Sequence, residues 1–225
     1  YNTEADRQSL LATFPRFRQL EQQYGSLTRG MLASKKAHPP RSEGPRLSMF
    51  TSFRGGMGEL VTALVDQLTV DMRLNTAVQS VTRKADGRYT LRLSDDETLQ
   101  ADAIIVTTPA PVAAQLAADL LPDDALHILR DIRSVSTGTI SLAYKLDDIV
   151  HPLDGFGVVI PRSAGRPINA ITWSSTKFDH RAPAGYGLLR VFFGGSRSPE
   201  AMALDDDALL VMARAQLAEL MDITA

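Results

Sequence analysis

Residues 53–60 read FRGGMGEL, a glycine-rich turn that leads into a helix. The elements that follow this turn in the sequence are the most informative about the fold. A helix is expected directly after the turn because apolar residues recur there at helical spacing. These residues are Leu60, Val61, Leu64, Val65 and Leu68.

Strand patterns follow this helix. Residues 73–81 and 88–93 alternate polar and apolar side chains, and Asp86-Gly87 between them is a two-residue hairpin signal. A second turn at 94–97 leads to Ala103–Val106, which is apolar on both faces, as expected of a fully buried strand. That strand should end at Thr107-Thr108-Pro109.

The rest of the chain predicts helices around one antiparallel sheet. Helical patterns cover 5–23 (with a break near Thr13 caused by Pro15), 26–36, 111–118, 122–131 and 205–221. Strands are expected at 135–146, 156–160, 167–174 and 187–193, most simply joined as a meander. The predicted fold class is α+β, an antiparallel or mixed sheet flanked by helices plus a β-hairpin portion within 51–109.

Composition narrows the range of functions. The 225 residues carry 24 basic and 26 acidic side chains, so a net charge of -2 gives no general attraction to nucleic acid or anionic lipid. The absence of cysteine excludes disulfides, thiolate metal sites and cysteine nucleophiles, and the four histidines lie far apart. No apolar run reaches the roughly 18 residues of a membrane span, so we expect a cytoplasmic protein or one peripheral to the membrane.

Five segments, taken together in their order along the chain, resemble the protoporphyrinogen oxidase and coproporphyrinogen III oxidase family, within the flavin-dependent amine oxidase superfamily. One is the turn, helix, hairpin and strand of 53–109. The others are Ser9-Leu10 with Thr13-Phe14-Pro15, then GFGVVIP (155–161), TWSS (172–175) and LLRVFFGG (188–195). The resemblance covers essentially the whole chain.

The family's pyrophosphate-binding motif does not occur in this sequence. Members of the family open with a G-x-G-x-x-G turn that cradles FAD, and they close over the flavin with a later glycine-containing segment. We therefore expect an internal fragment that is inactive by itself. By the resemblance, residues 1–50 and 110–225 form a substrate-binding domain, and 51–109 form part of an FAD-binding domain.

The resemblance implies that FAD performs the chemistry and that no side chain of this chain is catalytic. The family oxidises a porphyrinogen to the porphyrin in heme biosynthesis, and molecular oxygen takes the electrons. For the cofactor, the matching position is Val78, whose backbone would meet the adenine. Thr107, Thr108 and Pro109 are further candidates because they end the predicted buried strand at its carboxyl end, the usual ligand edge of an open sheet. A core valine and a simple strand-ending turn are the alternative interpretations.

A flat macrocycle calls for an apolar slot with a few cationic groups. The resemblance implies that its walls are Ile140, Leu142, Phe156, Val158 and Trp173, although each could equally be ordinary sheet core. The family's arginine for a substrate propionate is expected upstream of Tyr1.

Two other functions stay open at this point. Another superfamily member, such as an amine oxidase or a carotenoid desaturase, would share the glycine turn and the hairpin. A non-catalytic module that binds a hydrophobic ligand would need no flavin. The sequence also leaves open a homodimer and peripheral membrane association.

Overall fold

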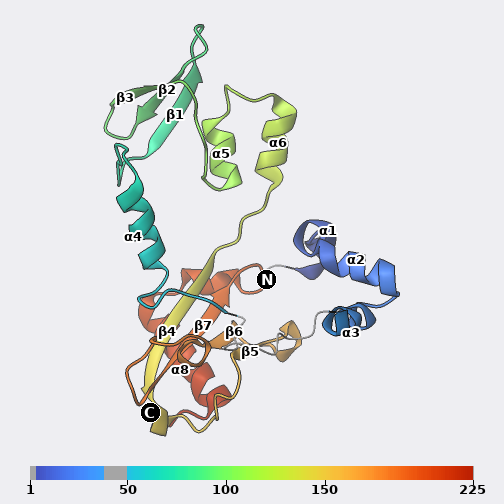
Figure 1. The fold of residues 1–225 in the computed structure, drawn as a ribbon. Coiled ribbons are helices and arrows are strands. Elements are labelled where there is room, and N and C mark those ends of the chain that lie inside the picture. Colours follow the sequence, from blue (N-terminus) through green and yellow to red (C-terminus); the bar gives the residue numbers. More distant parts are fainter. Residues whose placement is uncertain (1–3, 38–49, 225) are drawn as a thin grey trace. The chain divides into compact units, whose positions relative to one another are not determined.

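The computed structural model describes residues 4–37 and 50–224 (Figure 1). Contacts divide the chain into two compact units, the first made of Tyr1–Ala63 with Val135–Ala225 and the second of Leu64–Ser134. We call them the sheet unit and the hairpin unit. Contacts place 51–63 in the sheet unit and 110–134 in the hairpin unit, and the assignment of 1–50 with 110–225 to a substrate-binding domain and of 51–109 to an FAD-binding domain stays a prediction.

Three helices open the sheet unit: α1 (Leu10–Thr13), α2 (Pro15–Tyr24) and α3 (Leu27–Ala37). The break expected near Thr13 is confirmed, because Pro15 begins α2 at a position where its missing N–H is not needed. Ser9 caps α1 by accepting a hydrogen bond from the Ala12 N–H at 3.2 Å, and α2 ends at Gly25 in the left-handed conformation.

The larger sheet contains β4 (Thr137–Lys145), β5 (Gly157–Val159), β6 (Ile168–Trp173) and β7 (Tyr186–Gly194). Its strand order is β4-β7-β6-β5, and all neighbours are antiparallel. The expected meander holds for β5, β6 and β7 but is wrong for β4, which pairs with β7. The 11 residues between Lys145 and Gly157 carry the chain from one edge of the sheet to the other.

One face of this sheet forms the hydrophobic core with helix α8 (Asp206–Met221). Ile171, Leu189 and Val191 are almost completely buried there, as are Leu217 and Met221 from α8. The alternation of buried and exposed residues along β4 and β7 fits a sheet covered on one side. Asp205 caps α8 by accepting a hydrogen bond from the Ala208 N–H at 2.8 Å.

The hairpin unit holds a smaller sheet of β1 (Val78–Arg83), β2 (Tyr89–Leu93) and β3 (Thr98–Ala101), in the order β1-β2-β3. The predicted hairpin is confirmed, but its loop has three residues, 85–87, instead of two. The Lys84 N–H donates to the Arg88 carbonyl at 2.7 Å, and Gly87 adopts a positive φ of 89°. That conformation suits glycine at the end of a three-residue hairpin loop.

Helices α5 (Ala110–Leu116) and α6 (Asp123–Asp131) complete this unit, and α4 (Gly58–Gln67) spans the boundary between the two units. The buried strand expected at Ala103–Val106 is wrong: the segment forms no strand, and Ile105 is 89% exposed. A fully buried strand needs a paired strand on each side. Within 4–37 and 50–224, no strand pairs with this segment.

Candidate functional site

In the sheet unit, the glycine turn is held by one arginine. The Arg181 guanidinium donates to the Arg54 carbonyl at 3.0 Å, and to the Ser52 hydroxyl and the Phe53 carbonyl at 2.8 Å each. The turn itself closes with a bond from the Gly56 N–H to the Phe53 carbonyl at 3.0 Å. Residues about 130 positions apart in sequence are thereby joined.

A pocket of about 430 Å³ lies beside this contact, between the segment 50–54, Phe156 and residues 176–181. Aromatic rings supply much of its wall: Phe50 meets Phe156 edge to face at 5.0 Å and Phe178 at 6.3 Å. The Lys177 ammonium lies 3.9 Å from the centre of the Phe50 ring. Aromatic walls with cations beside them suit a flat ligand that carries negative charge.

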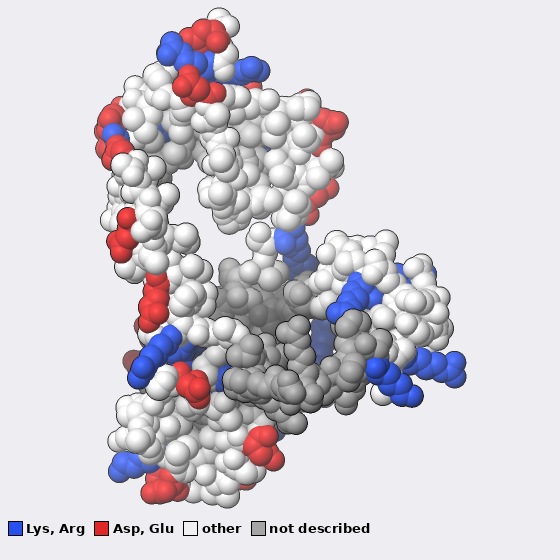
Figure 2. All heavy atoms as spheres, in the orientation of Figure 1, with Lys and Arg blue, Asp and Glu red and all other residues white. Residues whose placement is uncertain are grey.

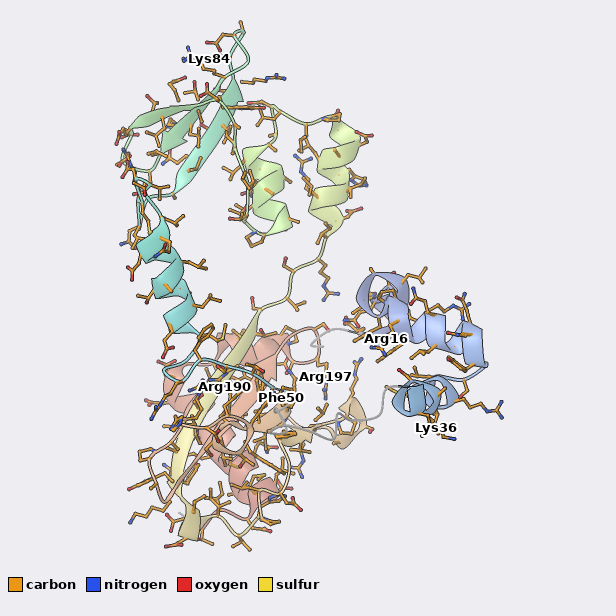
Figure 3. The ribbon with its side chains drawn as sticks, in the orientation of Figure 1. Arg16, Lys36, Phe50, Lys84, Arg190 and Arg197 are labelled. Carbon is orange, nitrogen blue, oxygen red and sulfur yellow. The ribbon has the colours of Figure 1, made fainter. Side chains whose placement is uncertain are left out.

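The strand register defines a second surface on the same unit, on the side of the larger sheet away from the core. One row across the strands contains Gly157, Thr172, Arg190 and Ser141, and the next contains Val159, Ala170, Phe192 and Thr139. All of these residues are exposed or half-buried, and Val159 is 80% exposed. We call these two rows the open face. It combines small side chains, the aromatic ring of Phe192 and one cation, Arg190, which is labelled in Figure 3.

The structure separates the predicted substrate residues. Ile140 and Leu142 pack against the hydrophobic core, and Trp173 is 5% exposed within it. Phe156 lines the pocket, while Val158 is partly exposed on β5. Contact of these five residues with a ligand stays a prediction.

Sequence reasoning missed the open face because it chose the more apolar residue of each alternating pair. Apolar residues at every second position of a strand face the core, so the ligand-accessible side is the other one. Thr139, Ser141 and Thr172 alternate with Ile140, Leu142 and Trp173, and that alternation was the available signal.

In the hairpin unit, hydrogen bonds at the start of β1 show which way the backbone of Val78 faces. The Ser94 N–H donates to the Ala77 carbonyl at 2.9 Å, and the Ala77 N–H donates to the Ser94 hydroxyl at 3.1 Å. Successive residues of a strand direct their amide groups to opposite sides, so those of Val78 point away from β2. Since β1 is the edge strand of this sheet, no strand in the described ranges pairs with that side, and contact of Val78 with an adenine stays a prediction.

Thr107, Thr108 and Pro109 are exposed and lead into α5, with the Pro109 carbonyl accepting from the Ala113 N–H at 2.9 Å. They follow Val106, which lines an apolar pocket of about 340 Å³ together with Ile104, Val81, Tyr89 and residues of α5 and α6. The three residues do not themselves line this pocket, and their contact with a cofactor stays a prediction.

Charges are mixed over the surface, and Figure 2 shows basic and acidic side chains interspersed at the tip of the hairpin. In the described part of the chain, no helix is long and apolar enough to span a bilayer. The same residues contain no group of three or more His, Asp or Glu side chains that could hold a metal ion.

The described residues thus form a helix-backed antiparallel sheet with an open face and a separate hairpin unit with its own small sheet. The family model "Flavin containing amine oxidoreductase" matches residues 1–224. The chain belongs to this family, which uses a flavin cofactor.

Relatives within the family make the match more specific. The chain is 29% identical to coproporphyrinogen III oxidase of Bacillus subtilis over 99% of this chain and 47% of the relative. It is 27% identical to a chloroplastic protoporphyrinogen oxidase of Nicotiana tabacum over 93% of this chain and 41% of the relative. A crystal structure of a proposed protoporphyrinogen oxidase from Exiguobacterium superposes with a TM-score of 0.79 at 28% identity, covering 99% of this chain and 46% of the other. The chain thus spans about half the length of these relatives.

Proposed function

We propose that this chain is part of an FAD-dependent oxidase that converts a porphyrinogen to the porphyrin in heme biosynthesis. The observation that carries the proposal is the similarity to porphyrinogen oxidases along almost the whole chain. The open face supports it, because a flat macrocycle needs a broad surface with few bulky charged groups.

In this proposal, the flavin supplies the chemistry and the open face positions the substrate. When bound, FAD accepts a hydrogen and its electron pair from the substrate and passes electrons to molecular oxygen. The open face would hold the macrocycle so that one carbon–hydrogen bond is presented in a fixed geometry, and positioning of this kind lowers the barrier without an acid–base side chain. Three two-electron oxidations remove six hydrogens from the porphyrinogen, and each of them reduces one molecule of oxygen to hydrogen peroxide.

The three hydrogen bonds donated by Arg181, which we call the arginine clamp, would support substrate binding in the neighbouring pocket. Arg181 ties the turn at 53–56 to the connection between β6 and β7. Its three donated bonds fix the wall of the aromatic pocket before a ligand arrives, and a preorganised site loses less entropy on binding.

The direct test uses the full-length protein with its flavin. Porphyrinogen is supplied in the reduced form, porphyrin fluorescence is followed with time, and FAD is identified after release. Bound FAD with rising porphyrin fluorescence supports the proposal. If flavin is bound but neither protoporphyrinogen nor coproporphyrinogen yields porphyrin, the proposal is overturned in favour of amine oxidation or desaturation. If the protein contains no flavin, a non-catalytic module that binds a hydrophobic ligand is favoured.

A matched pair of variants then tests the open face. Val159→Asp places a negative charge on that face and should raise the KM for a carboxylate-bearing porphyrinogen about tenfold, by repulsion and by lost apolar contact. Val211→Asp introduces the same charge at an exposed position of α8, where Val211 is 69% exposed, and should leave the KM unchanged. Equal effects from the two variants contradict a substrate role for the open face.

A further inference from the structure

Arg190 occupies the middle of the open face. It lies on β7, opposite Ser141 of β4 on one side and Thr172 of β6 on the other. Its Nε donates to the Ser141 hydroxyl at 3.3 Å, and its side chain is exposed. Within the described ranges it forms no ion pair with a carboxylate, although a guanidinium is charged at every physiological pH.

Three other arginines near the larger sheet have structural partners. Arg166 bonds to Glu219 at 2.5 Å and to Gln216 at 3.1 Å, and Arg197 donates to the Ile160 carbonyl at 2.9 Å. Arg181 makes the three bonds of the clamp. By comparison, Arg190 makes one long hydrogen bond to a hydroxyl, which contributes little to the stability of the fold.

The neighbours of Arg190 leave room for an anion. Gly157, Thr172 and Ser141 share its row, and none of them has a side chain larger than threonine. Phe192 stands two residues along the same strand, on the same side of the sheet. A planar guanidinium on a shelf of small side chains, with an aromatic ring beside it, is suited to bidentate pairing with a carboxylate on the edge of a flat ligand.

We infer that Arg190 binds a propionate of the porphyrinogen and makes the site prefer a tetracarboxylate substrate to a dicarboxylate one. This inference rests on the proposed function. Coproporphyrinogen III carries a propionate on each of its four pyrrole rings, whereas protoporphyrinogen IX carries two propionates and two apolar vinyl groups. A vinyl group placed over Arg190 leaves the guanidinium desolvated and without a partner, which weakens binding of the dicarboxylate.

Steady-state kinetics of the full-length flavoprotein with both porphyrinogens test the inference. Arg190→Met keeps an unbranched side chain but removes the charge and the hydrogen-bond donors, and it should lower kcat/KM for coproporphyrinogen by about ten- to a hundredfold, mainly through KM. For protoporphyrinogen the loss should stay below about threefold. Arg190→Lys should recover part of the preference because it restores the charge without the bidentate geometry.

Two further variants separate the position of the charge from its mere presence. Arg214→Met removes an exposed arginine from α8, which covers the opposite face of the sheet. It should leave kcat/KM unchanged for both substrates. Ser141→Ala removes the hydroxyl that holds Arg190 and should reduce the preference for coproporphyrinogen by only a few-fold. Circular dichroism establishes that each variant is folded.

The outcomes distinguish this inference from the proposed function. If the wild-type protein oxidises porphyrinogens but Arg190→Met weakens both substrates equally, or neither, the inference is wrong and the function stands. If the wild-type protein oxidises neither, the function fails. Binding of coproporphyrin III, followed by its fluorescence, then decides about Arg190: weaker binding to Arg190→Met supports a carboxylate site, and equal binding overturns it.

Discussion

The two sheets of this molecule use the same antiparallel pairing but differ in what they leave exposed. In the sheet unit, apolar side chains face α8, and the exposed side carries hydroxyls, glycine and Arg190. In the hairpin unit, Val70, Leu74 and Ile105 are 61%, 75% and 89% exposed. Apart from Val159 and Phe192, the open face therefore exposes small and polar groups, whereas these three positions of the hairpin unit expose apolar ones.

These two kinds of exposure have different consequences. A polar open face is stable in water and can remain free until a ligand arrives. Exposed apolar side chains leave hydrophobic free energy unused, about 25 cal/mol for each Å² that could be buried, and large apolar patches mark surfaces that contact other protein. Covering Val70, Leu74 and Ile105 would thus add stability to the hairpin unit, whereas Arg190 and the hydroxyls of the open face already interact favourably with water.

The largest effect is expected in the core of the sheet unit. Leu217→Ala removes a completely buried side chain from α8 and should lower the free energy of unfolding by about 2–5 kcal/mol. Trp173 is the single tryptophan of the chain and lies in this core, so its fluorescence in a urea titration reports on the sheet unit. Val211→Ala on the exposed side of α8 is the control and should change stability by less than about 0.5 kcal/mol. Equal losses would contradict a core centred on α8.

A smaller effect is expected at the arginine clamp. Arg181→Met removes three donated hydrogen bonds and should lower the free energy of unfolding by about 1–3 kcal/mol, because carbonyls at the turn then rely on water. Hydrogen exchange of the Gly56 amide, which closes the turn, should become faster. Arg181→Lys keeps the charge but not the fork of donors, so it should behave like Arg181→Met. Unchanged exchange in both variants would show that the turn holds itself.

Local patterns predicted most of the secondary structure. The break before Pro15, the helix behind the glycine turn and the capped helix after Asp205 follow from backbone chemistry within a few residues. The hairpin around Gly87 was also predictable, apart from the extra residue in its loop.

Features that depend on distant residues were not predictable. Pairing of β4 with β7 joins positions about 50 residues apart, and no local signal marks it. Ala103–Val106 has the composition of a buried strand but not the neighbours of one in the described chain. The candidate site shows the same limit. Phe156 was predicted from the sequence and lines the aromatic pocket, but the register that groups Arg190 with Ser141 and Thr172 exists only once the sheet is assembled.

A still smaller effect is expected from the exposed segment of the hairpin unit. Ile105→Ser should change the stability of this chain by less than about 0.5 kcal/mol, because the side chain already lies in water, and it should reduce self-association in light scattering. Leu93→Ala, at a position only 2% exposed in the same unit, should cost about 2–5 kcal/mol in a thermal unfolding experiment. A large loss with Ile105→Ser would mean that the segment is buried and that the contrast between the two units is wrong.

The smallest effects are expected from exposed carboxylates, one in each unit. The hydrogen bond from Arg166 lowers the pKa of Glu219 below its ordinary value of 4.5, and a bond from the Arg88 backbone N–H lowers that of Asp86 below 3.8. A lowered folded-state pKa contributes stability that is present above the ordinary pKa and is lost as the pH falls through the folded one. Carbon-detected NMR titration should therefore give both midpoints below those ordinary values.

Arg166→Gln should return Glu219 to its ordinary pKa and leave Asp86 unchanged, because the two groups belong to different units. Both carboxylates are solvated, so the accompanying change in stability is small and should shrink further in salt. A shift of Asp86 in the Arg166 variant would instead reveal electrostatic coupling between the units. The titration thus tests, with the least disturbance to either sheet, whether the sheet unit and the hairpin unit respond independently.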